Sequence, residues 1–160
     1  HRPWWLGGMK MEWQRYEFRV STDPGLLQSA VIHDFLRQTS WAKDIPATLV
    51  AKALDGSLCF GLYKGDLQIG LARVITDRAT LAYLSDMFVL EEFQGKGLGQ
   101  WLLSCVLAHP ELQGLRRILL STQDAHELYR KQGFSELSHP EQMMEISHPD
   151  LYKDEVNHLS

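Results

Sequence analysis

Three glycines stand at alternate positions in the stretch from Gln94 to Gln100, between an apolar run and a segment of helical periodicity. Alternate glycines weaken the start of a helix, so their presence needs another explanation. Without side chains in the way, the backbone amides of residues 95–99 can converge on a phosphate at a helix N-terminus, where unpaired N–H groups and the helix dipole favour negative charge. The spacing therefore indicates a pyrophosphate-binding loop, with a plain glycine-rich turn as the alternative.

Two other phosphate-binding motifs fit this stretch less well. A P-loop is excluded because the sequence contains no Gly-Lys-Ser or Gly-Lys-Thr. The dinucleotide fingerprint has similar spacing, but it belongs to the first turn of a parallel strand-helix-strand unit, whereas this loop follows consecutive strand patterns. A dinucleotide-dependent oxidoreductase is therefore kept only as the least favoured of three hypotheses for the function.

The elements that must position this loop are indicated by a switch between the periods of strands and helices. The expected strands are Tyr16–Val20, Leu58–Tyr63, Ile69–Thr76, Leu81–Leu90, Arg117–Ser121 and Met143–Ile146. The expected helices are Pro24–Gln38, Pro46–Leu54, one from Leu98 to His109-Pro110, and one capped by Asp124 and ended by Gly133. The order β-α-α-β-β-β-α-β-α-β predicts an α/β (α+β) fold with a mixed, mostly antiparallel central sheet and helices on both faces.

Two motifs resemble those of the GNAT family of N-acetyltransferases, and the resemblance covers the chain from about Tyr16 to Ile146. The first, Gln94-x-x-Gly97-x-Gly99, resembles the pyrophosphate-binding signature of the family. The second, Ala125-x-x-Leu128-Tyr129-x-Lys131-x-Gly133-Phe134, resembles the segment whose tyrosine stands beside the sulfur of coenzyme A. The two motifs in this order are more specific than either alone. The chain departs from the family at Thr122, where asparagine is common.

The resemblance implies acetyl-CoA as cofactor and direct transfer of its acetyl group to a primary amine in a ternary complex. It places pantetheine along Tyr83 to Val89 and makes Tyr129 the general acid, although a core tyrosine on an amphipathic helix is the alternative for that residue. Lys96 faces a phosphate or, equally, only solvent. The implied cofactor-binding residues are Met87, Phe88, Val89, Gln94, Gly95, Lys96, Gly97, Leu98, Gly99, Gln100, Thr122 and Ala125.

The group that takes the proton from the amine is harder to assign. An alkyl amine with a pKa of about 10.4 is neutral in only about one molecule per thousand at pH 7. The family often places its base at positions that match Tyr83 and Ser85, and neither is a strong base here. Strict alternation turns Asp86 to the opposite face of the strand, where we expect a buried carboxylate held by hydrogen bonds. Proton removal through water, held by Tyr83 and Ser85, is therefore expected.

Composition narrows the range of partners. The formal net charge of −4 and the pI of about 6.0 leave no basic stripe for nucleic acid. No apolar run is long enough for a membrane helix. Two cysteines without metal or disulfide spacing suggest a reducing compartment, and hence the cytoplasm. His109, His139 and His148 each precede proline without other ligands at metal-binding spacing, so no metal is expected.

The length of 160 residues fits one domain, expected over residues 12–160, after an N-terminal extension of residues 1–11 that is mobile or artificial. His33 and Trp41 fall in the region where the family shapes its acceptor pocket, and packing explains each equally well. The amine acceptor, a small molecule or a protein, stays open. A homodimer is possible because dimers are frequent in the family. The main alternative function is a non-catalytic acyl-CoA-binding or regulatory module on the same fold.

Overall fold

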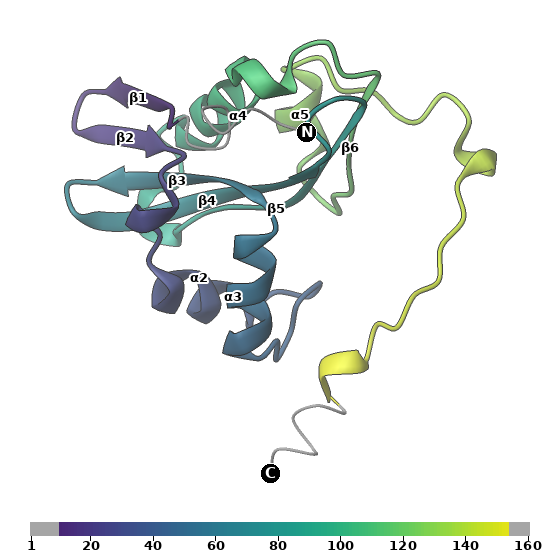
Figure 1. Cartoon of the computed structure of the whole chain (residues 1–160), viewed down its shortest axis with the longest axis horizontal. Helices are drawn as coiled ribbons and strands as arrows, with labels where there is room; N and C mark the ends of the chain where they lie inside the picture. The colour runs from purple at the N-terminus through teal and green to yellow at the C-terminus, as the bar shows by residue number, and fades with distance from the viewer. Residues whose placement is uncertain (1–9, 154–160) are drawn as a thin grey trace.

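The computed structural model describes residues 10–153 (Figure 1). Its strands are β1 (Glu12–Arg15), β2 (Phe18–Ser21), β3 (Leu58–Lys64), β4 (Leu67–Thr76), β5 (Leu81–Val89) and β6 (Arg117–Leu120). Its α-helices are α2 (Ser29–Leu36), α3 (Ala47–Asp55), α4 (Leu98–Ala108) and α5 (His126–Arg130). Short 3-10 helices cover Pro24–Leu26, Glu91–Phe93, Pro110–Leu112 and Pro140–Gln142. Of the expected N-terminal extension, residues 1–9 lie outside the described residues.

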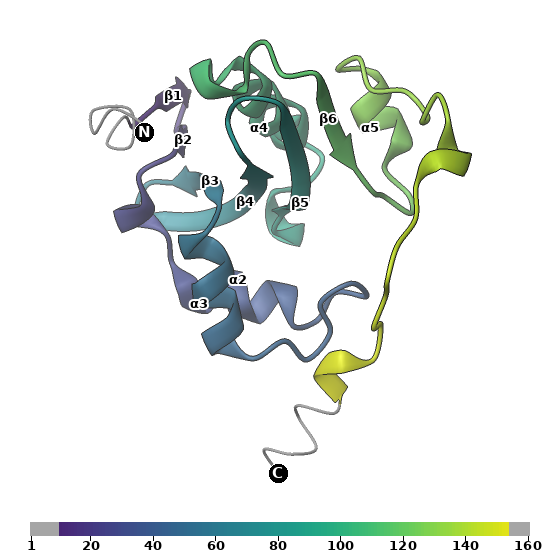
Figure 2. The ribbon, with the colours of Figure 1, turned by 45° about the vertical axis from the view of Figure 1, so that its right-hand side comes forward.

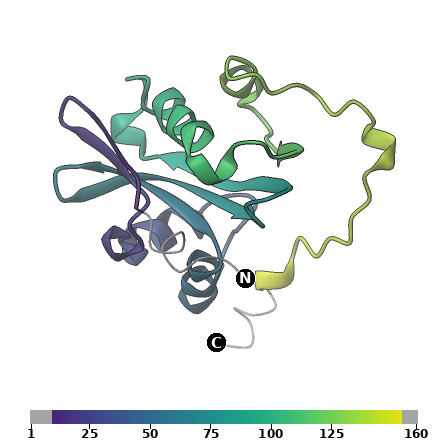
Figure 3. The same ribbon diagram turned by 45° about the horizontal axis from the view of Figure 1, so that its top comes forward.

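The strands form one six-stranded sheet in the order β1-β2-β3-β4-β5-β6. All neighbours are antiparallel except β5 and β6, which are parallel. Helices α2 and α3 lie on one face of the sheet and α4 on the other (Figure 3). The prediction of a mixed, mostly antiparallel sheet with helices on both faces is therefore confirmed. Within residues 10–153, no helix is both long and apolar enough to cross a bilayer.

Each face of the sheet has its own apolar core. On the α4 face, Phe60, Ala82 and Leu84 pack with Leu102 of the helix. On the α2/α3 face, Ile32 and Val50 pack against Leu71 and Phe88. The nine-residue α3 and eleven-residue α4 agree closely with their expected ranges because their apolar periodicity matches the face that each buries.

The N-terminal strand prediction was incomplete. The segment expected as a single strand from Tyr16 is a hairpin, in which Tyr16 occupies the turn with φ 55°. The preceding strand was missed, although its ladder with β2 runs from Glu12↔Ser21 to Arg15↔Phe18. Met11 also joins the hairpin, because its amide donates to Thr22 Oγ1 over 2.8 Å.

The first helix was predicted too long. Residues Pro24–Leu26 form a 3-10 turn capped by Asp23, and the chain is extended at Leu27 before α2 begins. The break is caused by a contact distant in sequence. The Gln28 amide donates to the side chain of Gln68 over 2.7 Å, and the amide of the fully buried Gln68 donates back to Gln28 Oε1 over 3.1 Å. Satisfying a buried polar side chain outweighs the helical pattern at this point.

The predicted final strand was wrong. Residues 143–146 have no strand pairing and are exposed, with Met144 96% and Ile146 91% accessible. The sixth strand of the sheet comes from the N-terminal hairpin instead. We call residues 135–150 the C-terminal arm; all of them are exposed, and they run away from the body of the protein (Figure 2).

Candidate active site

The glycine-rich loop joins the end of β5 to α4 and has the backbone shape that glycine permits. Gly95 has φ 80° and Gly97, the N-cap of α4, has φ 77°, both in the left-handed region that other residues avoid. A Cβ at either position would meet nothing within 4 Å, so conformation and not crowding requires glycine there. The Gln94 side chain donates to the Val89 carbonyl over 2.9 Å and ties the loop to β5.

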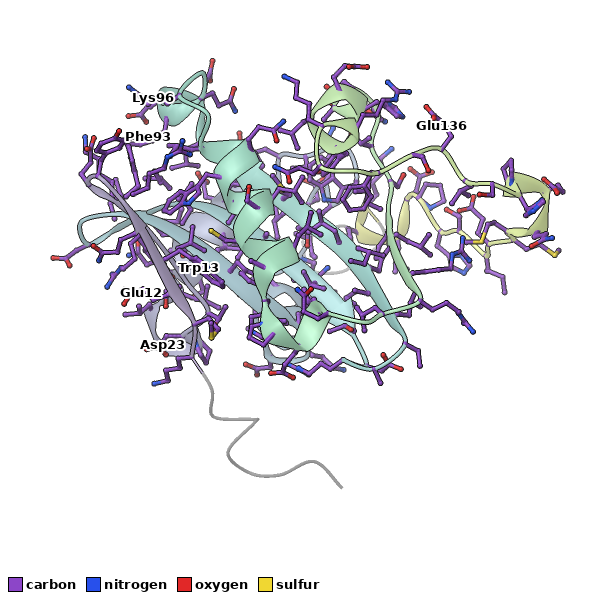
Figure 4. All side chains as sticks on the ribbon, turned by 90° about the horizontal axis from the view of Figure 1, so that it is seen from above. Glu12, Trp13, Asp23, Phe93, Lys96 and Glu136 are labelled. Carbon is purple, nitrogen blue, oxygen red and sulfur yellow. The ribbon has the colours of Figure 1, made fainter. Side chains whose placement is uncertain are left out.

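The start of α4 presents unpaired hydrogen-bond donors. Among the described residues, no backbone or side-chain acceptor pairs with the amides of residues 95–100, and the first helical bond from the loop is Trp101 N–H to Gly97 O at 3.1 Å. The side chain of Lys96 is exposed at the tip of this loop, near Phe93 (Figure 4). Free amides, a helix N-terminus and a cation together form a suitable site for a diphosphate.

Gly99 and Gln100 have a packing role that the sequence did not reveal. A Cβ on Gly99 would lie 3.3 Å from Leu128 Cδ1, so glycine lets α5 approach α4 closely. The Gln100 side chain donates to the Leu128 carbonyl over 3.1 Å and accepts from Gln132 Nε2 over 3.0 Å. These two predicted cofactor residues therefore connect the helices that carry the two motifs.

Strands β5 and β6 stop pairing about half-way along β5. They pair only from Leu81↔Arg117 to Leu84↔Leu120, and β6 ends there. In the described part of the chain, residues 86–89 of β5 are paired with β4 but with no strand on the side of β6. Apart from the Val89 carbonyl, which accepts from Gln94, their outer main-chain groups are thus available to an extended ligand. This part of the strand contains Met87, Phe88 and Val89.

A β-bulge in β5 contradicts the expectation that Asp86 and Ser85 face opposite sides. The register shifts so that Arg73 faces Asp86 while Val74 faces Leu84, which leaves Ser85 as the extra residue. Arg73 donates from Nε to Asp86 Oδ2 over 2.6 Å and from Nη2 to Ser85 Oγ over 2.8 Å. Ser85 and Asp86 consequently meet on the α2/α3 face.

The expected buried carboxylate is present, and its partners come from three parts of the chain. Asp86 is 5% exposed and also accepts a hydrogen bond from Trp41 Nε1 over 2.7 Å. Arg73 donates further to Ser57 Oγ over 3.0 Å. Sequence reasoning missed Arg73 and Ser57, although a charged residue within the apolar run of β4 was a usable signal. A buried ion pair with this many hydrogen bonds fixes the bulge in place.

A cavity of about 180 Å³ lies beside this network. Its polar wall is Arg73, Ser85 and Asp86, and its other walls come from α2, α3, the loop between them and Tyr152, near the end of the described chain. His33 braces that loop through Nε2, 2.9 Å from the Ile45 carbonyl oxygen. Tyr83 is 37% exposed and does not line the cavity, so the structure brings Ser85 but not Tyr83 to it.

Tyr129 is held by the C-terminal cap of α5. Gly133 has φ 101°, its amide donates to the Arg130 carbonyl over 3.0 Å, and the Phe134 amide donates to the Tyr129 carbonyl over 3.1 Å. This is a Schellman motif, and its usual apolar contact is the edge-to-face pair of Tyr129 and Phe134, 5.7 Å between ring centroids. Burial, with a smaller effect of nearby Asp124, raises the pKa of Tyr129. The phenol therefore stays protonated at neutral pH and can donate.

The start of α5 differs from the expected cap at Asp124. The N-cap is Ala125, without a side-chain cap, and its amide donates to Thr122 Oγ1 over 3.1 Å. Thr122 thus shapes the turn that leads from β6 into α5. Because the Thr122 hydroxyl bonds this turn locally, Asp124 is not needed to satisfy the first amide.

The chain matches the profile of the acetyltransferase (GNAT) domain over residues 55–136. It is 39% identical over 142 residues to FG08082, a presumed acetyltransferase of Gibberella zeae, covering 74% of this chain and 79% of that protein. The structure resembles that of a presumed GNAT acetyltransferase from Xanthomonas campestris pv. campestris, with 51% identity, a TM-score of 0.82, and coverage of 84% of this chain and 96% of that one.

A more distant structure shares the fold. It is a GNAT family acetyltransferase from Elizabethkingia anophelis with acetyl-CoA bound, at 18% identity and a TM-score of 0.60, covering 76% of this chain and 78% of that one. Taken together, the fold, the loop and the second motif define an acyltransferase. The chain belongs to the GNAT acetyltransferase family.

Proposed function

We propose that this protein is an acetyl-CoA-dependent N-acetyltransferase that transfers the acetyl group to a primary amine by direct attack in a ternary complex. The observation that carries the proposal is the set of unpaired amides at residues 95–100, at the point where β5 loses its neighbour β6. A diphosphate at α4 and an extended pantetheine along β5 would use these two features. The bound nucleotide would supply the acetyl group as a thioester.

Different residues of the chain would then bind the cofactor, orient it and donate a proton. Main-chain donors from the loop bind the diphosphate, with Lys96 adding a positive charge. Backbone groups of residues 87–89 hold the ligand and orient its carbonyl. Tyr129 donates a proton to the departing thiolate; its raised pKa keeps the phenol protonated but makes it a weaker acid, so the donation depends on its position beside the sulfur. Gly99 and Gln100 act indirectly because they hold α5, and with it Tyr129, against α4.

The amine is proposed to enter from the α2/α3 face, where the cavity reaches Ser85. The Ser85 hydroxyl accepts from Arg73 and keeps its own proton to donate, so it can hold a water molecule. The amine loses its proton through such a water. Tyr83, exposed on the same strand, plays a lesser part than expected. The buried, unpaired thiols fit a reducing compartment, and we place the protein in the cytoplasm.

A thermal-shift titration tests the proposal. Acetyl-CoA should raise the unfolding temperature, because a ligand that binds only the folded state stabilises it, whereas NAD should not. Mass spectrometry of amine mixtures should then show acceptors that have gained one acetyl group. Stabilisation without transfer to any amine of a broad panel would favour the alternative, a non-catalytic acyl-CoA-binding module.

A further inference from the structure

The cavity on the α2/α3 face has walls of two different kinds. Its polar wall comes from the sheet, with Arg73 of β4 and both Ser85 and Asp86 of β5. Its apolar walls come from α2, α3 and the loop between them, which cover this face of the sheet (Figure 3). The apolar side chains that line it are Leu36, Ala42, Ile45, Val50, Ala53 and Leu54. A ligand that fills this space therefore needs a polar group at one end and an apolar body at the other.

The polar wall carries no net charge. Arg73 and Asp86 are the charged residues that line the cavity within residues 10–153, and they form an ion pair with each other. Both oxygens of Asp86 already accept hydrogen bonds, Oδ1 from Trp41 and Oδ2 from Arg73. A charged ligand would lose its hydration here without meeting an unbalanced charge of opposite sign, which is costly. The cavity therefore favours an amine with a single nitrogen, bound in its neutral form, over a polycation.

The volume of the cavity limits the size of the apolar body. An apolar cavity of roughly 150 Å³ accommodates a benzene molecule. The cavity of this protein measures about 180 Å³. One ring or one branched alkyl group fits, together with the carbon that carries the nitrogen. A peptide main chain does not suit the apolar walls, because its N–H and C=O groups would lose their hydrogen bonds with water there.

Hydrogen bonds hold the cavity in shape. Trp41, in the loop between α2 and α3, donates to Asp86 and so ties that loop to the sheet. His33 of α2 reaches the other end of the loop, with Nε2 2.9 Å from the Ile45 carbonyl oxygen. Val50 of α3 is 2% exposed and packs in the core of this face. A cavity fixed in this way selects ligands by shape, since little ordering is needed when a ligand binds.

We propose that the acceptor is a compact monoamine with one apolar, ring-sized body. This inference rests on the proposed acetyltransferase function and specifies its substrate class. The body lies against α2 and α3, and the nitrogen lies at Ser85, beside the part of β5 proposed for pantetheine. There the nitrogen forms a bond to the acetyl carbon and the carbon–sulfur bond breaks. The thiolate takes the proton of Tyr129, the amine proton leaves through water, and the phenol recovers a proton from solvent.

Rates of acetyl transfer to four amines test the substrate class. Cyclohexylmethylamine and methylamine are alkylamines of similar basicity, and only the first carries a ring. Loss of a single methylene from a group that fills a pocket already lowers kcat/KM about tenfold or more, so the ring should raise it by at least that factor. Cyclohexylmethylamine should also exceed 1,4-diaminobutane and a peptide with one lysine. Equal or faster transfer to any of the other three amines would overturn the inference, whereas the acetyltransferase function would stand.

Ala53→Leu tests the cavity itself. The larger side chain fills part of the space, and leucine is a good helix former, so α3 should persist in the circular dichroism spectrum. We expect kcat/KM for cyclohexylmethylamine to fall by at least about tenfold, with that for methylamine and the affinity for acetyl-CoA unchanged. The matched control is Ala51→Leu, the same substitution on the exposed side of α3, which should change none of these. Equal losses for the two amines in Ala53→Leu would speak against a ring in the cavity.

A binding measurement separates failure of this inference from failure of the proposed function. Saturation-transfer NMR should detect the ring of cyclohexylmethylamine on the wild-type protein, and much less of it on Ala53→Leu. Such binding without transfer to any amine would contradict the acetyltransferase function but support the class of ligand. Neither binding nor transfer of the ring-bearing amine, with transfer to 1,4-diaminobutane or the peptide, would leave an acetyltransferase of another substrate class and overturn the inference.

Discussion

Arg73 and Asp86 form a buried ion pair across β4 and β5, with Nε and Oδ2 2.6 Å apart and side-chain exposures of 14% and 5%. The pair lies at the bulge that turns Ser85 and Asp86 to the same face. It therefore connects the packing of the sheet to the wall of the proposed acceptor cavity. Because Trp41 also donates to Asp86, the loop between α2 and α3 depends on the same carboxylate.

Asp86→Asn should destabilise the fold strongly. The substitution leaves the Arg73 charge buried without its partner, and breaking such a pair from one side costs about 3–5 kcal/mol. Urea unfolding followed by circular dichroism measures the loss. The matched control is Glu127→Gln, which breaks the exposed pair with Arg130 and should change the free energy of unfolding far less. Equal effects of the two variants would refute the structural role of Asp86.

Tyr129→Phe should separate catalysis from binding. The ring keeps its contact with Phe134, so the fold and the affinity for acetyl-CoA should be unchanged, whereas the loss of the proton donor should lower kcat by about 10²–10⁴-fold. Steady-state kinetics with an identified acceptor, together with calorimetric titration of acetyl-CoA, give both quantities. Tyr83→Phe serves as the control and should lose much less activity. A Tyr129→Phe enzyme as fast as the wild type would remove the general-acid assignment.

The stability of the protein should fall in alkaline solution. Burial raises the pKa of both the Cys59 and Cys105 thiols from 9.0 to about 12. Above pH 9 the unfolded chain releases these protons while the folded chain retains them. The stabilisation is therefore complete below pH 9 and is lost as pH rises toward 12, at up to about 1.4 kcal/mol per pH unit for each thiol.

Urea unfolding measured at intervals between about pH 8 and pH 11 checks this slope. The double variant C59A/C105A should show a shallower decline, although it is less stable at neutral pH because it leaves small cavities. Identical slopes for the wild type and the double variant would mean that the thiols ionise equally in both states.

The best-predicted helices and strands are those whose apolar residues all lie on one buried face. Helices α3 and α4 and strands β3 to β6 lie within a few residues of their expected positions. The end of α5 at Gly133 was also foreseen, because a glycine cap depends on local chemistry. The two motifs are connected through Gly99 and Gln100, and this connection was not foreseen, since it depends on the contact of α4 with α5.

The errors come from contacts between residues distant in sequence. The Gln28 and Gln68 side chains break the first helix by bonding to each other's amides across 40 positions. The bulge at Ser85 shifts the faces of β5 by one residue, which alternation along a single strand does not reveal. The alternation of Met144 and Ile146 with polar neighbours resembles that of a strand, but within residues 10–153 no strand pairs with this segment, and the pattern alone does not form one.

Calorimetric titration of acetyl-CoA into the wild type, Gly97→Ala and Gly114→Ala tests the central claim, that the amides around Gly97 bind the diphosphate. Gly114, with φ 72° and open space around it, is a matched glycine in the turn between Pro110–Leu112 and β6, beyond the other end of α4. Alanine in the left-handed region costs roughly 1–2 kcal/mol at either position, so both variants should lose similar stability. Only Gly97→Ala should displace the loop amides and weaken acetyl-CoA binding, by at least about tenfold, equivalent to about 1.4 kcal/mol. Wild-type affinity in Gly97→Ala, or equal losses in both variants, would contradict the account.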